Sequence, residues 1–174
     1  AVRYALSFPN AVHHEAKVTA SFSGLPAKPL HVRMARSSPG RYALHDFAKN
    51  VYYVVATDGS NHPLPLNRPD QYGWDVTPAA DGTVLFSYTL YGDQTDGTFV
   101  GIDQQHAHLN LPATLCYATG LENRSAEVKF DLPAGWKAAT QLRPGADKTT
   151  FTAPNLQYLM DSPVSLGAQQ GLPL

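Results

Sequence analysis

The sequence has few of the residues that several classes of protein require. Among its 174 residues there is a single cysteine, Cys116, so no disulfide can form within the chain. There is no run of lysine and arginine, and the formal net charge is −1, which argues against a nucleic-acid partner. No apolar stretch approaches the roughly 20 residues of a membrane span. The sequence therefore favours a folded domain without nucleic-acid-binding or membrane-spanning segments.

Long helices are also scarce, because fourteen prolines and thirteen glycines interrupt the chain. Hydrophobic residues make up 43% of the sequence and charged residues 16%, a composition that supports a packed core. The length suits one domain. We expect this domain to cover residues 1–167, with residues 168–174 forming a tail that lacks any periodic pattern.

Alternation of apolar and polar residues is the dominant pattern, and it predicts β-strands. It occurs at residues 2–8, 16–22, 30–34 and 126–132, and residues 83–91 are rich in β-branched and aromatic side chains. Residues 51–55 are apolar throughout, which favours a strand covered on both faces. We therefore predict an all-β fold, an antiparallel two-sheet β-sandwich.

One or two short helical turns are expected within this sandwich. The first lies in residues 41–50 and the second in residues 155–160. In the second, Leu156, Leu159 and Met160 share one helical face, and Asn155 is placed to cap the first turn.

The densest polar cluster is Asp103-Gln104-Gln105-His106-Ala107-His108-Leu109-Asn110. On a strand, His106, His108 and Asn110 would face one way and the apolar residues between them the other. Two histidines at this spacing can bind zinc, but a site needs a third ligand and supporting partners. Asp103 is the candidate third ligand. A polar strand face remains the main alternative.

His13-His14-Glu15 resembles part of a zinc-binding helix motif, which needs a second histidine four residues after the first. Lys17 and Val18 occupy those positions, so the spacing fails. The segment leads directly into an alternating run. We therefore predict the polar entry to a strand and no metal site there.

Aromatic residues allow two interpretations. Six of them could form a sugar-binding platform, or they could pack in the core or an interface: Tyr52, Tyr53, Tyr72, Trp74, Tyr88 and Tyr91. Trp74 and Trp136 alternate with polar neighbours and are expected in the core. Cys116 lies in an apolar run and is expected to be a small buried hydrophobe.

Four ordered segments together carry a family resemblance. They are Ser38-Pro39-Gly40-Arg41-Tyr42, Phe47-Ala48-Lys49-Asn50-Val51-Tyr52, Gly135-Trp136-Lys137-Ala138-Ala139-Thr140 and Asp161-Ser162-Pro163-Val164. In this order they resemble the N-terminal domain of the glycyl aminopeptidase family of zinc metallopeptidases. The resemblance runs from about residue 4 to about residue 167. Its specificity comes from the number and order of the segments.

This resemblance implies a β-sandwich that packs on a catalytic domain carrying an H-E-x-x-H helix, a motif that this sequence does not contain. We therefore expect no catalytic or metal-ligating residue here, zinc only in the catalytic domain, and a chain that is inactive by itself. The implied partners are that catalytic domain and its peptide substrate. A periplasmic or secreted location is favoured over a cytoplasmic one.

In related zinc aminopeptidases the front domain lends polar residues to the rim of the active site. The resemblance therefore suggests substrate-cleft or interdomain roles for Gln104, Gln105, His106, His108, Asn110, Arg41 and Tyr42. Two other functions remain open. One is a stand-alone binding module for a carbohydrate or a protein ligand. The other is a purely structural module, which predicts a broad apolar patch where the catalytic domain would cover it.

Overall fold

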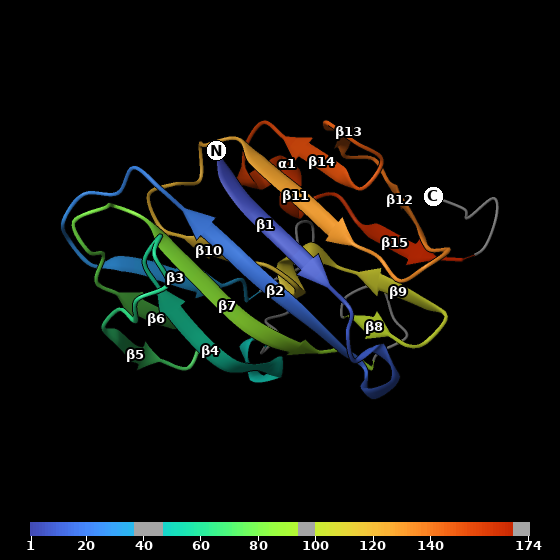
Figure 1. The fold of residues 1–174 in the computed structure, drawn as a ribbon, viewed down its shortest axis with the longest axis horizontal. Coiled ribbons are helices and arrows are strands. Elements are labelled where there is room, and N and C mark those ends of the chain that lie inside the picture. The colour runs from blue at the N-terminus through green and yellow to red at the C-terminus, as the bar shows by residue number, and fades with distance from the viewer. Residues whose placement is uncertain (37–46, 94–99, 169–174) are drawn as a thin grey trace.

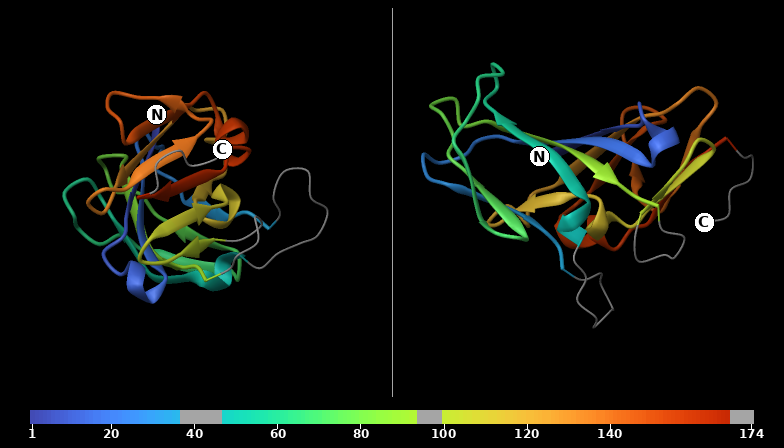
Figure 2. Two further views of the ribbon diagram at one scale, coloured as in Figure 1. Left: turned by 90° about the vertical axis from the view of Figure 1, so that its right-hand side faces the viewer. Right: turned by 90° about the horizontal axis from the view of Figure 1, so that it is seen from below.

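The computed structural model describes residues 1–36, 47–93 and 100–168. Strands dominate these residues and form three sheets arranged in two layers (Figures 1 and 2). Among the described residues, no helix has the length and apolar character needed to cross a membrane. The prediction of an all-β sandwich with short helical turns is confirmed.

One layer is a seven-stranded sheet with the order β13-β14-β11-β1-β2-β7-β4. Its strands are β1 (Val2–Ser7), β2 (Glu15–Phe22), β4 (Val51–Thr57), β7 (Val84–Tyr91), β11 (Ala126–Asp131), β13 (Arg143–Pro144) and β14 (Thr150–Ala153). Three of the four alternating runs of the sequence, at residues 2–8, 16–22 and 126–132, lie on β1, β2 and β11 of this sheet. In β1 and β2 every second side chain is buried, as the pattern predicts.

The other layer consists of two four-stranded sheets. The first has the order β10-β3-β6-β5, with β10 (Cys116–Ala118), β3 (Leu30–Met34), β6 (Gly73–Val76) and β5 (Leu66–Asp70). The second has the order β12-β15-β9-β8, with β12 (Lys137–Thr140), β15 (Val164–Gly167), β9 (His106–Leu109) and β8 (Gly101–Ile102). In Figure 1 they lie at opposite ends of the large sheet, β3 and β6 on the left and β9 and β15 on the right.

The core lies between the layers and is built from the inward positions of both. Its largest fully buried side chains include Phe22, Phe86, Tyr88 and Phe130 from the seven-stranded sheet. Met34 and Leu109 meet them from the two small sheets. Trp74 is also in the core, as predicted, whereas Trp136 is only partly buried and packs against Phe8 with ring centres 5.8 Å apart.

One strand pair in the large sheet is parallel. β1 pairs with β11 in parallel register, with Val2 opposite Ala126 and Ser7 opposite Asp131. The other pairs described in the three sheets are antiparallel. The sandwich is therefore antiparallel except where a long connection brings β11 beside the first strand.

Short helical turns occur near the predicted places. Helix α1 (Leu156–Met160) begins at Asn155, whose side chain accepts a hydrogen bond from the Tyr158 amide at 2.9 Å, so the predicted cap is confirmed. A 3₁₀ turn spans Phe47–Asn50, the part of the predicted 41–50 turn that is described. Two more 3₁₀ turns span Ala11–His13 and Leu111–Ala113.

Strand β4 does not follow its prediction. Residues 51–55 were expected to be covered on both faces, yet Tyr52, Tyr53 and Val55 are 50%, 80% and 53% exposed. The reason is that β4 is the edge strand of the large sheet, where β7 is the one named strand beside it in the described part of the chain. A β-bulge between Tyr52 and Val55, where Tyr53 has φ of 55°, also breaks the alternation.

Two tyrosines of the large sheet join it to the start of β10 in the other layer. The Tyr4 hydroxyl donates to the Cys116 carbonyl at 2.8 Å. The Tyr88 hydroxyl donates to the Thr114 carbonyl at 2.7 Å and accepts from the Cys116 amide at 3.0 Å. Burial raises the pKa of the Cys116 thiol to about 12. The thiol is therefore protonated at neutral pH, which confirms Cys116 as a small buried hydrophobe.

Candidate functional site

The predicted polar cluster forms the hairpin between β8 and β9. Asp103 and the two exposed glutamines, Gln104 and Gln105, make its tip. The Asp103 carboxylate accepts from the Gln105 amide at 2.7 Å and from the His106 amide at 2.9 Å, and it lies 3.2 Å from His106 Nδ1. These contacts hold the tip in one conformation while both glutamine side chains remain available to solvent.

Asp103 is ionised at neutral pH. Partial desolvation acts to raise the pKa of its carboxyl group. The hydrogen bonds from the Gln105 and His106 backbone amides and the electrostatic interaction with the His106 ring have a larger opposite effect, so this pKa lies below its usual value. The carboxylate is therefore an acceptor that orders the hairpin and cannot donate a proton near neutral pH.

Strand β9 shows the alternation predicted for it. Ala107 and Leu109 are buried, and the side chains of His106 and His108 lie on the opposite, outer face. Neighbouring β15 places Gly167 opposite His106 and Ser165 opposite His108. A Cβ atom on Gly167 would lie 3.1 Å from the His106 Cβ atom, so the close approach of β15 depends on this glycine.

Asn110 directly follows β9 and is the N-cap residue of the 3₁₀ turn Leu111–Ala113. Its backbone carbonyl accepts from the Ala113 amide at 2.9 Å and from the Thr114 hydroxyl at 2.8 Å. Its side chain is partly buried, in contrast to the exposed glutamines. Asn110 thus belongs to the base of the hairpin. Arg41 and Tyr42, the other two predicted site residues, lie outside the described residues.

His14 attaches this hairpin to the large sheet, a role that the sequence did not indicate. Its Nδ1 atom donates to the Ile102 carbonyl at 2.5 Å, and its own carbonyl accepts from the Gly92 amide at 2.8 Å. The Gly92 carbonyl then accepts from the Ile102 amide at 2.9 Å. His14 also has φ of 64° and stands just before β2, which agrees with the predicted strand entry.

The histidines and carboxylates at this end of the domain do not make a metal centre. Among the described residues, no group of three or more His, Cys, Asp and Glu side chains is gathered closely enough to hold a metal ion. His106 and Asp103 contact each other, and His14 lies 3.5 Å from Asp93, but neither pair has a third ligand within the part of the chain that the structure describes. These residues therefore do not fit a zinc site.

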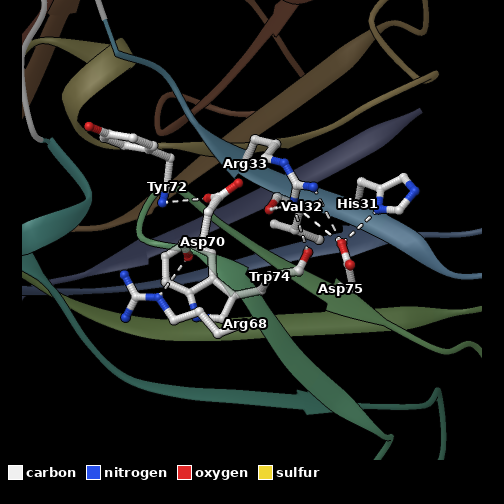
Figure 3. Close-up of polar contacts among 8 residues, drawn as sticks. All are labelled: His31, Val32, Arg33, Arg68, Asp70, Tyr72, Trp74 and Asp75. Atoms are coloured by element: carbon white, nitrogen blue, oxygen red, sulfur yellow. Dashed lines mark hydrogen bonds and ion pairs between the residues drawn. The ribbon is translucent and has the colours of Figure 1, made fainter.

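A second polar cluster lies on the outer face of the β10-β3-β6-β5 sheet (Figure 3). Asp75 on β6 accepts from His31 Nδ1 at 2.6 Å and lies 3.4 Å from both terminal nitrogens of Arg33. Because a carboxylate only accepts, the His31 proton in this contact is on Nδ1. The Arg33 side chain lies directly over Gly73. A Cβ atom added to Gly73 would lie 2.4 Å from Arg33 Cδ.

Two arginines near this cluster stack on aromatic rings. The Arg36 guanidinium lies 4.0 Å from the Tyr72 ring centre, and that of Arg68 lies 4.8 Å from the Trp74 ring centre. Arg68 also donates to the Asp70 and Gln71 carbonyls. Both arginines are therefore held against the sheet, and Arg68 covers the solvent side of the buried Trp74.

We expect Asp75→Asn to change the acid stability of the domain. The hydrogen bond from His31 is the main cause that lowers the pKa of Asp75, with help from Arg33 and against partial desolvation. Because the pKa of Asp75 is lower in the folded than in the unfolded protein, the ionised carboxylate stabilises the fold at pH values above the unfolded pKa of about 4. This stabilisation is lost as the pH falls through the folded pKa. Urea denaturation should therefore show wild type more stable than the variant by up to about 1 kcal/mol at pH 7, with a smaller difference at pH 3.

The matched control is Asp131→Asn, because Asp131 is exposed on β11 and makes no ion pair among the described residues. Its stability difference from wild type should be small at both pH values. A difference for Asp75→Asn that stays constant from pH 7 to pH 3 would contradict the linkage.

The six aromatics of the possible sugar platform do not share one surface. Trp74 and Tyr88 are buried in the core, and Tyr72 is covered by Arg36. Tyr52 and Tyr53 are exposed side by side, but their rings are tilted by 49° and are not coplanar. A platform built from all six is therefore excluded.

Comparison with known proteins identifies relatives of this fold. Residues 3–168 match the family model described as the peptidase M61 N-terminal domain. No sequence among the curated proteins matches significantly. An aminopeptidase N family protein from Idiomarina loihiensis is similar in structure, with a TM-score of 0.87 and 20% identity over 96% of this chain and 29% of that one.

Two more distant structures share the fold. The M1 zinc metallopeptidase from Deinococcus radiodurans has a TM-score of 0.54 and 13% identity over 95% of this chain and 41% of that one. A leukotriene A4 hydrolase from yeast, solved with bestatin, has a TM-score of 0.51 and 14% identity over 99% of this chain and 29% of that one. This chain thus spans between 29% and 41% of the length of these three proteins.

Proposed function

Since the chain belongs to the peptidase M61 N-terminal domain family, we propose that it is the non-catalytic front domain of a zinc-dependent glycyl aminopeptidase-like protein. In this proposal it packs on the catalytic domain and shapes the substrate cleft. In this proposal the zinc ligands belong to the catalytic domain. Among the described residues of this chain, no group of three or more His, Cys, Asp and Glu side chains could hold a metal ion. The names of similar proteins, among them a zinc metallopeptidase, support such a parent.

The β8–β9 hairpin carries the proposal. Its tip presents two exposed amide side chains, Gln104 and Gln105, on a backbone ordered by Asp103. Amide oxygens accept hydrogen bonds, so they suit the protonated amino group at the start of a peptide. The neighbouring His106 and His108 add polar groups on the same outer face. Polar side chains on an ordered hairpin are well suited to the rim of a cleft between two domains.

The position of β15 also supports the proposal that the surface around the β8–β9 hairpin faces the catalytic domain. β15 pairs directly with β9, and Gly167 at its end stands opposite His106. In a longer relative, the chain that continues beyond this strand would begin beside the hairpin. A domain connected there would meet Gln104 and Gln105 without a long linker.

The test uses the protein that carries both domains, assayed on peptides with N-terminal glycine or alanine. Replacing Gln104 and Gln105 together by alanine should raise KM about tenfold, as loss of a contact to the substrate amino group implies, with a smaller change in kcat. The control is Gln157→Ala, an exposed glutamine on helix α1. Its kinetics should equal those of wild type.

Two results would contradict the proposal. One is that the double variant keeps the wild-type KM. The other is metal-dependent turnover of glycyl or alanyl substrates by the 174-residue chain alone, which the proposal expects to be inactive even with added zinc.

A further inference from the structure

A pocket of about 500 Å³ lies at the end of the β10-β3-β6-β5 sheet. One wall is the connection between β2 and β3, and the other is the turn that follows β10. Both walls are held by backbone hydrogen bonds. The Leu25 amide donates to the Gly82 carbonyl at 3.0 Å, and the Thr119 amide donates to the His31 backbone carbonyl at 2.9 Å. The pocket is therefore part of the ordered fold, and its volume suits a small organic ligand.

The lining of this pocket is mostly apolar, with two basic side chains. Leu25, Pro26, Pro29, Leu30 and Leu121 provide the apolar surface. Lys28 and His31 provide the basic groups, and none of the lining residues is acidic. This combination suits a ligand that has an apolar body and one negative charge.

Neither basic group is neutralised in a way that would prevent such binding. Lys28 is exposed and makes no ion pair among the described residues. His31 donates from Nδ1 to Asp75, which is also engaged by Arg33, and the other edge of its ring is directed away from Asp75 (Figure 3). A carboxylate bound at that edge accepts a hydrogen bond from Nε2 when this nitrogen also carries a proton.

We propose that this pocket binds a small monocarboxylate with an apolar chain or ring. The apolar part lies against Leu25, Leu30 and Leu121, and the carboxylate contacts Lys28 and His31. A phosphate or a nucleotide fits less well, because a single lysine and a histidine with proline and leucine walls offer too few donors for a multiply charged group. This inference stands apart from the proposed role of the β8–β9 hairpin, and either can fail without the other.

The experiment titrates the protein with hexanoate and, separately, with its neutral counterpart hexanamide, followed by calorimetry and by amide NMR shifts. Hexanoate should bind saturably and about tenfold more tightly than hexanamide, as one favourable charge contact implies. The amides that shift should be those of the non-proline residues in 25–31 and of residues 119–121.

Three variants locate the site. Lys28→Glu should weaken hexanoate binding at least about tenfold and leave hexanamide binding unchanged, because it replaces attraction by repulsion. Lys148→Glu makes the same change in net charge at an exposed lysine that does not line the pocket, and it should bind hexanoate like wild type. Thr119→Trp, at an exposed position in the lining, should block both ligands by filling the pocket.

Three results would overturn the proposal. The first is the absence of saturable hexanoate binding. The second is an equal effect of Lys28→Glu and Lys148→Glu, which would indicate general electrostatics. The third is a set of shifted amides that lies outside the two pocket walls. Circular dichroism and the unfolding midpoint of each variant show whether it is folded, so a lost affinity is interpreted only for folded protein.

Discussion

Replacing Tyr88 by phenylalanine is expected to lower the free energy of unfolding by about 2–4 kcal/mol. The Tyr88 hydroxyl is buried between the layers, where it donates to the Thr114 carbonyl and accepts from the Cys116 amide. Phenylalanine would leave both backbone groups without this partner, and an unsatisfied buried polar group costs about 1–3 kcal/mol. Urea denaturation followed by tyrosine fluorescence or circular dichroism gives the difference directly.

Two further variants separate the hydrogen bonds from the loss of a hydroxyl group in general. Tyr4→Phe removes a single bond, to the Cys116 carbonyl, and should cost about 1–2 kcal/mol. Tyr91→Phe changes a tyrosine that is 39% exposed and should stay within about 0.5 kcal/mol of wild type. If Tyr88→Phe were no more destabilising than Tyr91→Phe, the two layers would not depend on this contact.

Replacing Gly92 by alanine is expected to cost about 2–3 kcal/mol and to displace the β8–β9 hairpin, because overpacking a tight site is destabilising. Gly92 is buried where the chain leaves β7, and it bonds to both His14 and Ile102. An added Cβ would lie 2.6 Å from Val100 Cγ1 and 2.7 Å from the Val100 carbonyl oxygen. Because a backbone atom is among these neighbours, the clash cannot be relieved by rotating one side chain.

The measurement combines denaturation with amide NMR, since the variant should shift the resonances of residues 101–109 as well as lower stability. Gly120→Ala is the control: Gly120 has φ of 94°, but no atom lies within 4 Å of its added Cβ. It should show backbone strain of about 1–2 kcal/mol and leave the hairpin resonances in place. Unchanged hairpin resonances in Gly92→Ala would contradict the proposed attachment through Gly92.

The local pattern of the sequence predicted the strands well, because burial on a strand repeats every second residue and needs no knowledge of the partner strand. Leu30–Met34 begins and ends where the alternation does, and β9 buries Ala107 and Leu109 as its pattern requires. The cap at Asn155 was equally accessible, since a cap is a contact between residues close in the chain.

Features that depend on the order of strands could not be predicted in this way. The apolar run at 51–55 has the composition of a central strand, but β4 is at an edge, and Tyr53 is therefore 80% exposed. The parallel pairing of β1 with β11 joins segments far apart in the chain and leaves no mark on either run.

The same division applies to the hairpin and to the pocket. The sequence alone determined which side chains of β9, residues 106–109, face outward, because the period of a strand assigns each residue to a face. Only the tertiary structure decided what holds that hairpin, namely His14 and Gly92 from the large sheet, and that Lys28 and His31 line one cavity with Leu121. These contacts join residues that are distant in the chain, and they arise when the layers pack and fix the relative positions of the strands.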